Sequence, residues 1–225
     1  MLLEMTKFKG FHMYRKIAAY IALILAVVGL ISLGVSTWVS DGFVRHLKTM
    51  TISEDVISKG SSFDIVYVLG GAQPSLQMKY ARLGSLSRTI QYKKILIPDR
   101  LGITEYRKDA GRNLTNNEWS FMQLERRGIG KQDVELVSIQ EGYFGTLSEA
   151  RAVTGLMEKR GYRTALLITA PHHTARVKRS FGRMFKDKRG TCYVTSSGEE
   201  AAVGELVMEN LKLMVYTFVL LPMQD

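Results

Sequence analysis

Short apolar runs alternate with helix-like segments along residues 64–220, and this alternation constrains the fold more than any other feature of the chain. Strands are expected at Asp64–Leu69, Lys94–Pro98, Val134–Ile139, Thr164–Thr169 and Thr191–Thr195. Helices are expected at Ser75–Leu86, Asn116–Arg127, Thr146–Arg160, Arg176–Phe185 and Glu199–Leu220. Strands of continuous β-branched residues and leucine, separated by helices, indicate an α/β domain whose mostly parallel sheet is covered by helices on both faces.

A long uncharged run precedes this domain. The run Ile17–Val39 would form a helix of about 34 Å, which is enough to cross a hydrocarbon core of roughly 30 Å. Tyr20 and Trp38 lie near its ends, where interfacial aromatic residues are common. We therefore predict one N-terminal transmembrane helix at 17–39. A buried core helix, or a signal cleaved near Gly34–Ser36, is the alternative.

Basic residues before this run predict its orientation. Residues 1–16 carry Lys7, Lys9, Arg15 and Lys16 against Glu4. The positive-inside rule then places this N-terminus in the cytoplasm and the rest of the chain outside, as in a single-pass protein of the bacterial inner membrane. Residues 40–62 are polar and predict a short stalk, followed by a globular domain at 63–225. The apolar end of the chain, 206–221, is expected to be a core helix rather than a second span, because it carries Glu209 and Lys212.

Composition limits the classes of partner. The net charge is +10, with 31 Lys and Arg against 21 Asp and Glu, but the basic residues are scattered and match no nucleic-acid-binding motif. We expect the membrane, rather than nucleic acid, as a partner. The lone Cys192 excludes an intramolecular disulfide and a cysteine-based metal cluster. His172 and His173 are adjacent rather than four residues apart, so no metal site is predicted, and the cofactor stays open.

The peptide Thr169–Arg176 carries the clearest chemical signal. A strand ends at Thr169, and His172, His173 and Arg176 follow at the start of a helix. Open α/β sheets bind ligands at the carboxyl ends of their strands, and helix N-termini attract anions. Arg176 adds a fork of hydrogen-bond donors. The peptide therefore predicts half of a site for a negatively charged ligand.

Other strand ends supply candidates for the same edge of the sheet. Gly70 and Gly71 follow the first strand and allow backbone N–H groups to approach an anion, although a tight strand-to-helix turn explains a lone pair of glycines better. Asp99 follows the second strand as a candidate ligand-binding residue or base, with a solvated loop as the alternative.

The third strand is followed by two glutamates. Glu141 and Glu149 are candidates for acid–base chemistry, and Thr146 is a candidate donor to the ligand. Thr146 and Glu149 also have the spacing of a capping box, which is a purely structural alternative.

Together these segments resemble the SanA/ElyC/YdcF family of bacterial envelope proteins over about residues 64–220. The resemblance rests on Asp64–Gly71, Asn117–Met122, Glu141 with Thr146–Ala150, Thr169–Arg176 and Met208–Leu213. The family pattern Thr-x-x-x-His-x-x-Arg selects His173 rather than His172. Two positions depart from the family: Pro98-Asp99-Arg100 stands where Ser-Gly-Gly is usual, and Lys79 or Arg82 replaces an arginine of the first helix.

The resemblance implies a Rossmann-like fold and a role in envelope integrity or cell-wall precursor metabolism. We expect a membrane-anchored protein whose extracytoplasmic domain binds an anionic ligand: a phosphorylated lipid carrier, a sugar phosphate or a nucleotide-like group. Glu141, Glu149 and His173 would be catalytic if the protein is a hydrolase or transferase. The alternatives are a non-catalytic envelope scaffold or regulator, which the departure at Asp99-Arg100 favours, and a small-cofactor-binding protein.

Overall fold

A computed structural model describes residues 41–140, 145–185 and 190–222. The chain divides into a unit at Met1–His46 and a compact unit at Leu47–Asp225. The predicted transmembrane run at 17–39 and the cytoplasmic segment 1–16 lie outside the described residues. Among the helices that are described, none is both long enough and apolar enough to cross a membrane.

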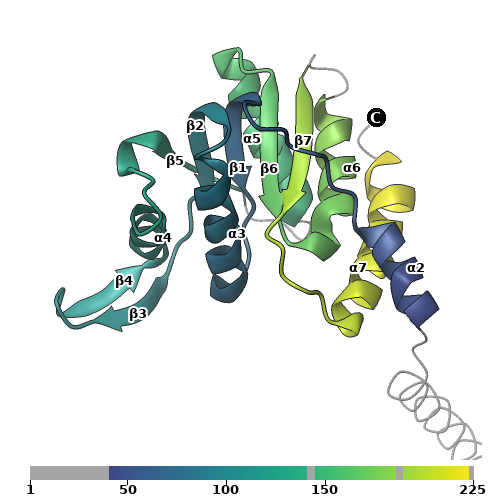
Figure 1. Ribbon diagram of the computed structural model, residues 1–225, viewed down its shortest axis with the longest axis horizontal. Coiled ribbons are helices and arrows are strands. Elements are labelled where there is room, and N and C mark those ends of the chain that lie inside the picture. The colour runs from purple at the N-terminus through teal and green to yellow at the C-terminus, as the bar shows by residue number, and fades with distance from the viewer. Residues whose placement is uncertain (1–40, 141–144, 186–189, 223–225) are drawn as a thin grey trace, which may run out of the picture. The chain divides into compact units, whose positions relative to one another are not determined.

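A five-stranded parallel sheet forms the centre of the compact unit (Figure 1). Its strands are β1 (Ser62–Val68), β2 (Gln91–Pro98), β5 (Val134–Val137), β6 (Thr164–Thr169) and β7 (Thr191–Ser196). They lie in the order β5-β2-β1-β6-β7, and every neighbouring pair is parallel. The α/β fold predicted from the sequence is confirmed, and the sheet is Rossmann-like because the chain returns to the centre and adds β6 beside β1.

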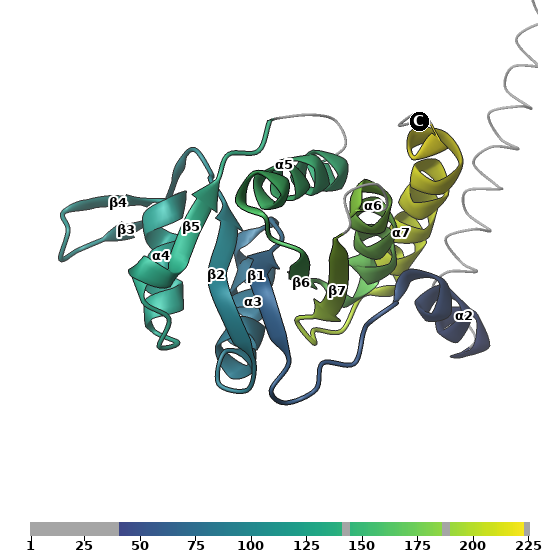
Figure 2. The ribbon, with the colours of Figure 1, turned by 90° about the horizontal axis from the view of Figure 1, so that it is seen from above.

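Helices cover both faces of the sheet (Figure 2). The helices are α3 (Gln73–Leu86), α4 (Asn116–Glu125), α5 (Gly145–Arg160) and α6 (Thr174–Phe185). Val66 and Val68 of β1 belong to the apolar cluster that contains side chains of α3 and α4. Ile65 and Tyr67 belong to the cluster of α5 and α6. The alternation of side chains along a strand explains why every position of β1 from Ile65 to Val68 is buried.

An antiparallel hairpin lies between β2 and α4, where the sequence pattern predicted neither strand. Its strands are β3 (Ile103–Arg107) and β4 (Arg112–Thr115). The hairpin lacks a continuous apolar run, because most of its residues are polar and exposed. A capping box of Thr115 and Glu118 begins α4, with Thr115 as the N-cap. The 3₁₀ turn η1 (Lys131–Asp133) then leads into β5.

The segment expected as a stalk is largely structured. It contains α2 (Asp41–Thr51), and an extended stretch follows before β1. Asp55 N donates to Val194 O over 2.8 Å, and Val194 N donates to the Asp55 carboxylate over 2.9 Å. Ser196 N donates to Glu54 over 2.9 Å. Residues from Leu47 on therefore belong to the compact unit and cover the outer edge of β7.

The end of the chain packs as a helix, as expected. The 3₁₀ turn η2 (Pro171–His173) precedes α6, and α7 (Val203–Val215) continues into the π-helical turn η3 (Tyr216–Leu220). Leu206, Glu209 and Leu213 of α7 are buried against the domain. The predicted helix thus begins at residue 203, because residues 197–202 form the connection from β7.

Candidate functional site

The site lies where β1 and β6 run side by side in the centre of the sheet. After β1 the chain continues to α3, and after β6 it continues to α6, so the two connections leave the same edge and separate. Rossmann-like sheets bind ligands at such a switch point. Gly70 and Gly71 follow β1, while Thr169 ends β6 and His173 lies in η2.

One cavity of about 270 Å³ brings most of the predicted residues together. Seven of them line it: Gly70, Gly71, Thr146, Glu149, Thr169, His173 and Arg176. Larger cavities of about 950 and 450 Å³ lie on either side and share lining residues with it, Gly70 among them. The strand ends therefore converge on one edge of the sheet, as predicted.

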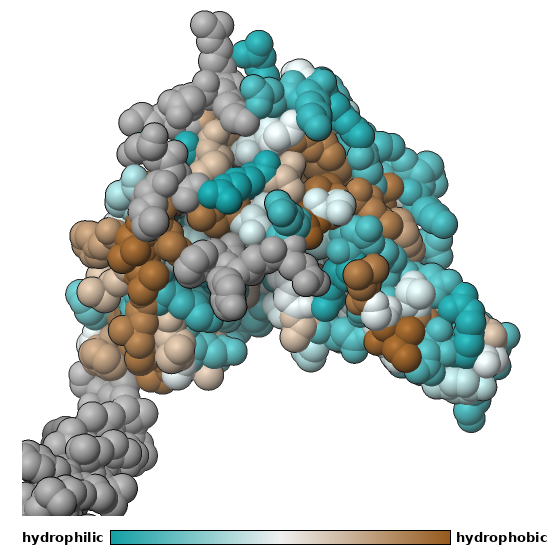
Figure 3. All heavy atoms as spheres, turned by 180° about the vertical axis from the view of Figure 1, so that it is seen from behind, coloured by the Kyte–Doolittle hydropathy of each residue, from teal (hydrophilic) through white to brown (hydrophobic). Residues whose placement is uncertain are grey.

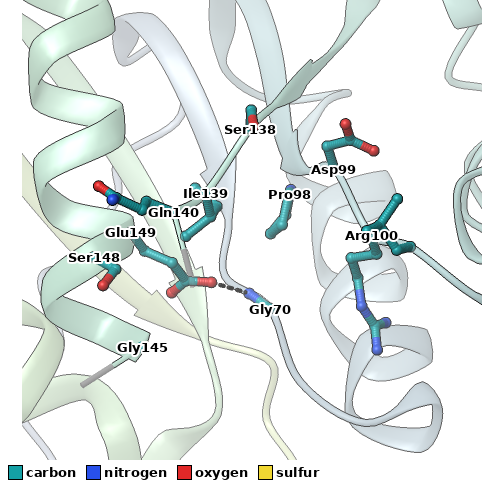
Figure 4. A pocket seen from close by; sticks show the side chains of 11 residues that line it. Gly70, Pro98, Asp99, Arg100, Ser138, Ile139, Gln140, Gly145, Ser148 and Glu149 are labelled. Carbon is teal, nitrogen blue, oxygen red and sulfur yellow. Dashed lines mark hydrogen bonds between the residues drawn. The ribbon is translucent and has the colours of Figure 1, made fainter. Parts of the chain in front are cut away.

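Glu149 forms the centre of this arrangement. Its Oε1 accepts a hydrogen bond from Gly70 N over 2.9 Å, which joins α5 to the end of β1 (Figure 4). Burial raises the pKa of Glu149, while the Gly70 N–H, Lys79 and Tyr67 oppose that shift. Burial, aided by Glu149, raises the pKa of the Tyr67 hydroxyl far above its usual range. A carboxyl group with a raised pKa at a cavity wall has the properties of a proton donor or acceptor.

Lys79 of α3 contacts the backbone at the glycine pair. Its Nζ donates to the carbonyl oxygens of Leu69 over 3.1 Å and Gly70 over 2.6 Å. Burial lowers the pKa of Lys79 to about 8, although Glu149 and Glu199 raise it in part. A Cβ on Gly71, whose φ is 154°, would come within 3.1 Å of Lys79 Nζ. The ammonium group is thus held directly beside the backbone that forms the cavity wall.

Arg176 is buried and already bonded to protein groups. Its guanidinium donates to both carboxylate oxygens of Glu209 on α7, and Nη1 donates to Thr146 Oγ1 over 2.5 Å. Its carbon Cζ lies 5.1 Å from the centre of the Tyr216 ring. Burial alone would lower the pKa of Arg176, but the bonds to Glu209 raise it overall. Arg176 therefore holds α6, α5 and α7 together and meets a ligand only at the cavity edge.

Thr146 and Glu149 do not pair with each other as the capping-box alternative required. Thr146 Oγ1 accepts from Arg176, and Glu149 accepts from Gly70. Both side chains thus reach across the sheet edge to other elements, which leaves them in the site rather than at their own helix end. Thr169 is buried, and its carbonyl oxygen accepts bonds from Ser197 N and Oγ over 2.9 and 3.0 Å.

The two histidines have different surroundings. His173 Nδ1 lies 2.8 Å from Glu209 Oε2 and 3.0 Å from Arg176 Nη2. The carboxylate favours a hydrogen on Nδ1, whereas the guanidinium can only donate and favours the tautomer with a bare Nδ1. A hydrogen on Nδ1 leaves Nε2 as an acceptor, and a hydrogen on Nε2 makes that nitrogen a donor toward the cavity. His172 is not bonded in this way, because its buried Nδ1 has no partner among the described residues. Burial, followed by the charge of His173, lowers the pKa of His172.

Asp99 lines the cavity of about 950 Å³ and is turned away from Glu149 (Figure 4). Its Oδ1 accepts a hydrogen bond from Asn117 Nδ2 over 2.6 Å, and Asn117 Oδ1 accepts from Arg100 N over 3.0 Å. Arg100 lines the same cavity, and its Nη1 is buried with no hydrogen-bond partner among the described residues. At this edge, Arg100 thus has more free donor capacity than Arg176.

Glu141, the remaining predicted site residue, lies outside the described residues. No group of three or more metal-binding side chains occurs in the described part of the chain. The residues that sequence reasoning did not assign are Tyr67, Arg100 and Glu209. None of the three lies in a sequence motif that indicates a site. Each is brought to the site by the packing of elements that are distant in the sequence.

Comparison with known proteins adds little to this geometry. No family model matches the chain, and neither does any curated protein. A solved structure described as the U34-tRNA thiolase NcsA from Methanococcus maripaludis with its [4Fe-4S] cluster is similar at 14% identity and a TM-score of 0.37. The match covers 77% of this chain and 66% of that one, which is just under two thirds of its length. Similarity at this level carries no functional argument.

Proposed function

We propose that the chain is a membrane-anchored protein of the bacterial envelope whose extracytoplasmic domain binds a phosphorylated ligand at the carboxyl edge of its sheet. The observation that carries the proposal is a cavity lined by Gly70, Gly71, Glu149 and His173 at the point where β1 and β6 diverge. The backbone N–H of Gly71, and Nε2 of His173 when it carries a hydrogen, are donors that suit phosphate oxygens.

Glu149 and His173 are the proposed catalytic pair if the ligand is hydrolysed or transferred. Glu149 has a raised pKa and would hold or accept a proton, while Nε2 of His173 would face the ligand. Glu209 positions His173, and Arg100 supplies donors from the far wall of the large cavity. If the phosphate group of a ligand lies in the central cavity, the rest of the ligand would extend into the large cavity, whose lining includes Pro98, Leu101 and Ile139.

The anchor and the resemblance support the setting. The apolar run 17–39 has the length of a membrane span, and the basic residues before it favour an extracytoplasmic domain. The motif order resembles that of the SanA/ElyC/YdcF family, whose members belong to the envelope. We include a phosphorylated lipid carrier among the ligands because a groove of about 450 Å³ leads from Thr146 and Arg176 to Leu211 and Val215 of α7.

The histidine pair provides the test of this proposal. Pyrophosphate should raise the melting temperature of the full chain in detergent micelles, because a ligand that binds only the folded state stabilises it. His173→Ala should abolish this rise, whereas His172→Ala should retain it. The two residues are adjacent and both partly buried, so each variant controls for the general effect of losing an imidazole. Equal responses from both variants would refute the assignment of His173.

Lys79 predicts how binding depends on pH. Its pKa is lowered to about 8, so its positive charge disappears as the pH rises through about 8. The affinity for pyrophosphate should therefore fall across this range in the wild type. Lys79→Arg keeps a charge at every accessible pH and should lose this dependence. Titrations of both proteins with the same probe separate the ionisation of Lys79 from that of pyrophosphate. A parallel decline in both would contradict the prediction.

A second candidate is a small-cofactor-binding protein. Glu199, Glu200 and Glu205 line the cavity next to Lys79 and His172, so part of this edge is acidic. A cofactor that carries a cationic group would fit these carboxylates better than a phosphate would. Thermal stabilisation by a cationic nucleotide cofactor, with no response to pyrophosphate, would favour this candidate over the first.

A further inference from the structure

The last helical stretch of the chain is apolar on both sides. Leu206, Leu213, Tyr216 and Leu220 face the domain and are buried. The opposite side carries large apolar side chains that are 45–73% exposed: Met208, Leu211, Met214, Val215, Phe218 and Val219. We call these six residues the apolar face. Figure 3 shows apolar atoms gathered at this side of the molecule, at left in that view.

Charges are sparse along this stretch. From residue 206 to 220 the charged side chains are Glu209 and Lys212. Glu209 is buried against Arg176, so it does not contribute to the outer surface. A helix that is apolar all round is normally covered on every side by protein or by lipid. The described residues leave the apolar face uncovered, and it therefore needs an occupant.

The short covalent link between the predicted anchor and α7's neighbour Leu47 points to a lipid occupant. Residues 47–53 are fixed beside α6 and α7: Asn210 Nδ2 donates to Leu47 O over 3.5 Å, and Ser53 N donates to Thr174 Oγ1 over 2.8 Å. The predicted span ends at Val39, eight residues before Leu47. Eight residues reach at most about 28 Å when fully extended. The covalent chain therefore keeps the end of the predicted span within this distance of Leu47.

We propose that the apolar face lies in the interfacial layer of the same bilayer that holds the predicted span. This inference rests on the membrane anchor of the proposed function. An amphipathic helix in the membrane plane buries its apolar side at the boundary of headgroups and acyl chains. Lys212 lies within the face, and the exposed Arg179, which donates to Thr217 Oγ1, lies beside it. Long basic side chains reach headgroup phosphates from such positions.

This docking would orient the catalytic edge. Leu211 and Val215 of the apolar face line a groove whose other lining residues include Thr146 and Arg176. With the face in the bilayer, the groove would open at headgroup depth. A ligand could then reach the site from the membrane surface as well as from bulk solvent. Neither the anchor nor the cavity alone would give the site this access.

Contact with lipid can be measured directly. In a Cys192→Ala background, Met214→Cys and, separately, Phe218→Cys would carry a small environment-sensitive fluorophore on the full chain in lipid vesicles. Gln132→Cys is the matched control, because Gln132 is exposed in η1 beside β5, the sheet edge opposite β7. Brominated lipids quench only fluorophores that touch acyl chains. We expect them to remove about half or more of the emission at positions 214 and 218 and almost none at 132.

The outcomes are distinct. Flotation of the full chain with the vesicles in a density gradient tests the anchor. If the chain floats but positions 214 and 218 are quenched no more than position 132, docking of the apolar face is refuted and the membrane anchor is retained. If position 214 is shielded from aqueous iodide but not quenched by brominated lipid, a second copy or another segment of the chain covers the face, and docking is again refuted. If the full chain does not float at all, both the anchor and the docking that rests on it are wrong.

Discussion

Glu209→Ala should lower the free energy of unfolding by about 3 kcal/mol or more, the range measured when one partner of a buried ion pair is removed. The carboxylate is 2% exposed, and its partner Arg176 is 10% exposed. Without Glu209, the guanidinium would stay buried with Thr146, His173 and the Tyr216 ring as its neighbours and with no carboxylate to neutralise it. His173 would lose the carboxylate that holds its ring. Denaturant unfolding of the full chain in micelles measures this loss.

A surface pair provides the control for Glu209. Glu135 bonds to Arg160 with similar geometry, but the side chains are 26% and 40% exposed, so Glu135→Ala should change stability little. If the two variants lose the same free energy of unfolding, the Arg176–Glu209 pair stabilises the fold no more than a surface pair does. Retention of the pyrophosphate response in Glu209→Ala would also show that His173 does not depend on Glu209 for its position.

The pH dependence of this contribution has a defined sign. Burial would raise the pKa of Glu209, but the bonds from His173 and Arg176 lower it below its ordinary value of 4.5. A carboxyl group whose pKa is lower in the folded state stabilises that state above its unfolded pKa and loses the effect as the pH falls through the folded value. The stability difference between the wild type and Glu209→Gln should therefore shrink in acid.

The sequence was sufficient to predict the sheet and much of its ligand edge. Parallel strands place their carboxyl ends together, so Gly70, Thr169 and His173 were expected to be neighbours before their contacts were known. The hairpin β3–β4 was missed because its strands are short and polar. Hydrophobic periodicity detects elements that bury one face, and this hairpin exposes most of its residues.

The partners of the site residues could not be predicted for a different reason. Arg176 was expected to bind the ligand, and no local pattern indicates that Glu209, 33 positions later, neutralises it. Lys79 was named only as a substitute for a family arginine, and its burial beside Gly70 follows from how α3 packs on the sheet. Long-range ion pairs depend on the packing of helices, which sequence spacing does not encode. The fold was thus easier to predict than the charge balance of its site.

Gly70→Ala should disrupt both stability and binding, because the new methyl group has no space. A Cβ at this position would lie 2.8 Å from Glu149 Oε1 and 3.7 Å from Pro98. The carboxylate would have to move and give up the bond from Gly70 N, which leaves a buried polar group without its partner. We expect a loss of about 2 kcal/mol in the free energy of unfolding, with no remaining response to pyrophosphate.

Gly155→Ala is the matched control, with an expected effect of opposite sign. Gly155 lies inside α5, and a Cβ there would meet nothing within 4 Å. Alanine is a better helix former than glycine, so this variant should be more stable by about 1 kcal/mol and should still respond to pyrophosphate. Both changes add one methyl group, and they differ only in what that group meets.

A double-mutant cycle identifies Glu149 as the group that the methyl displaces. Glu149→Ala removes the carboxylate, so adding Gly70→Ala to it should cost much less stability than Gly70→Ala costs in the wild type. Residues in direct contact show such coupling, whereas independent residues show additive effects. Additive losses would mean that the damage at Gly70 comes from the backbone or from Pro98, and the central role given to the Gly70–Glu149 bond would then be wrong.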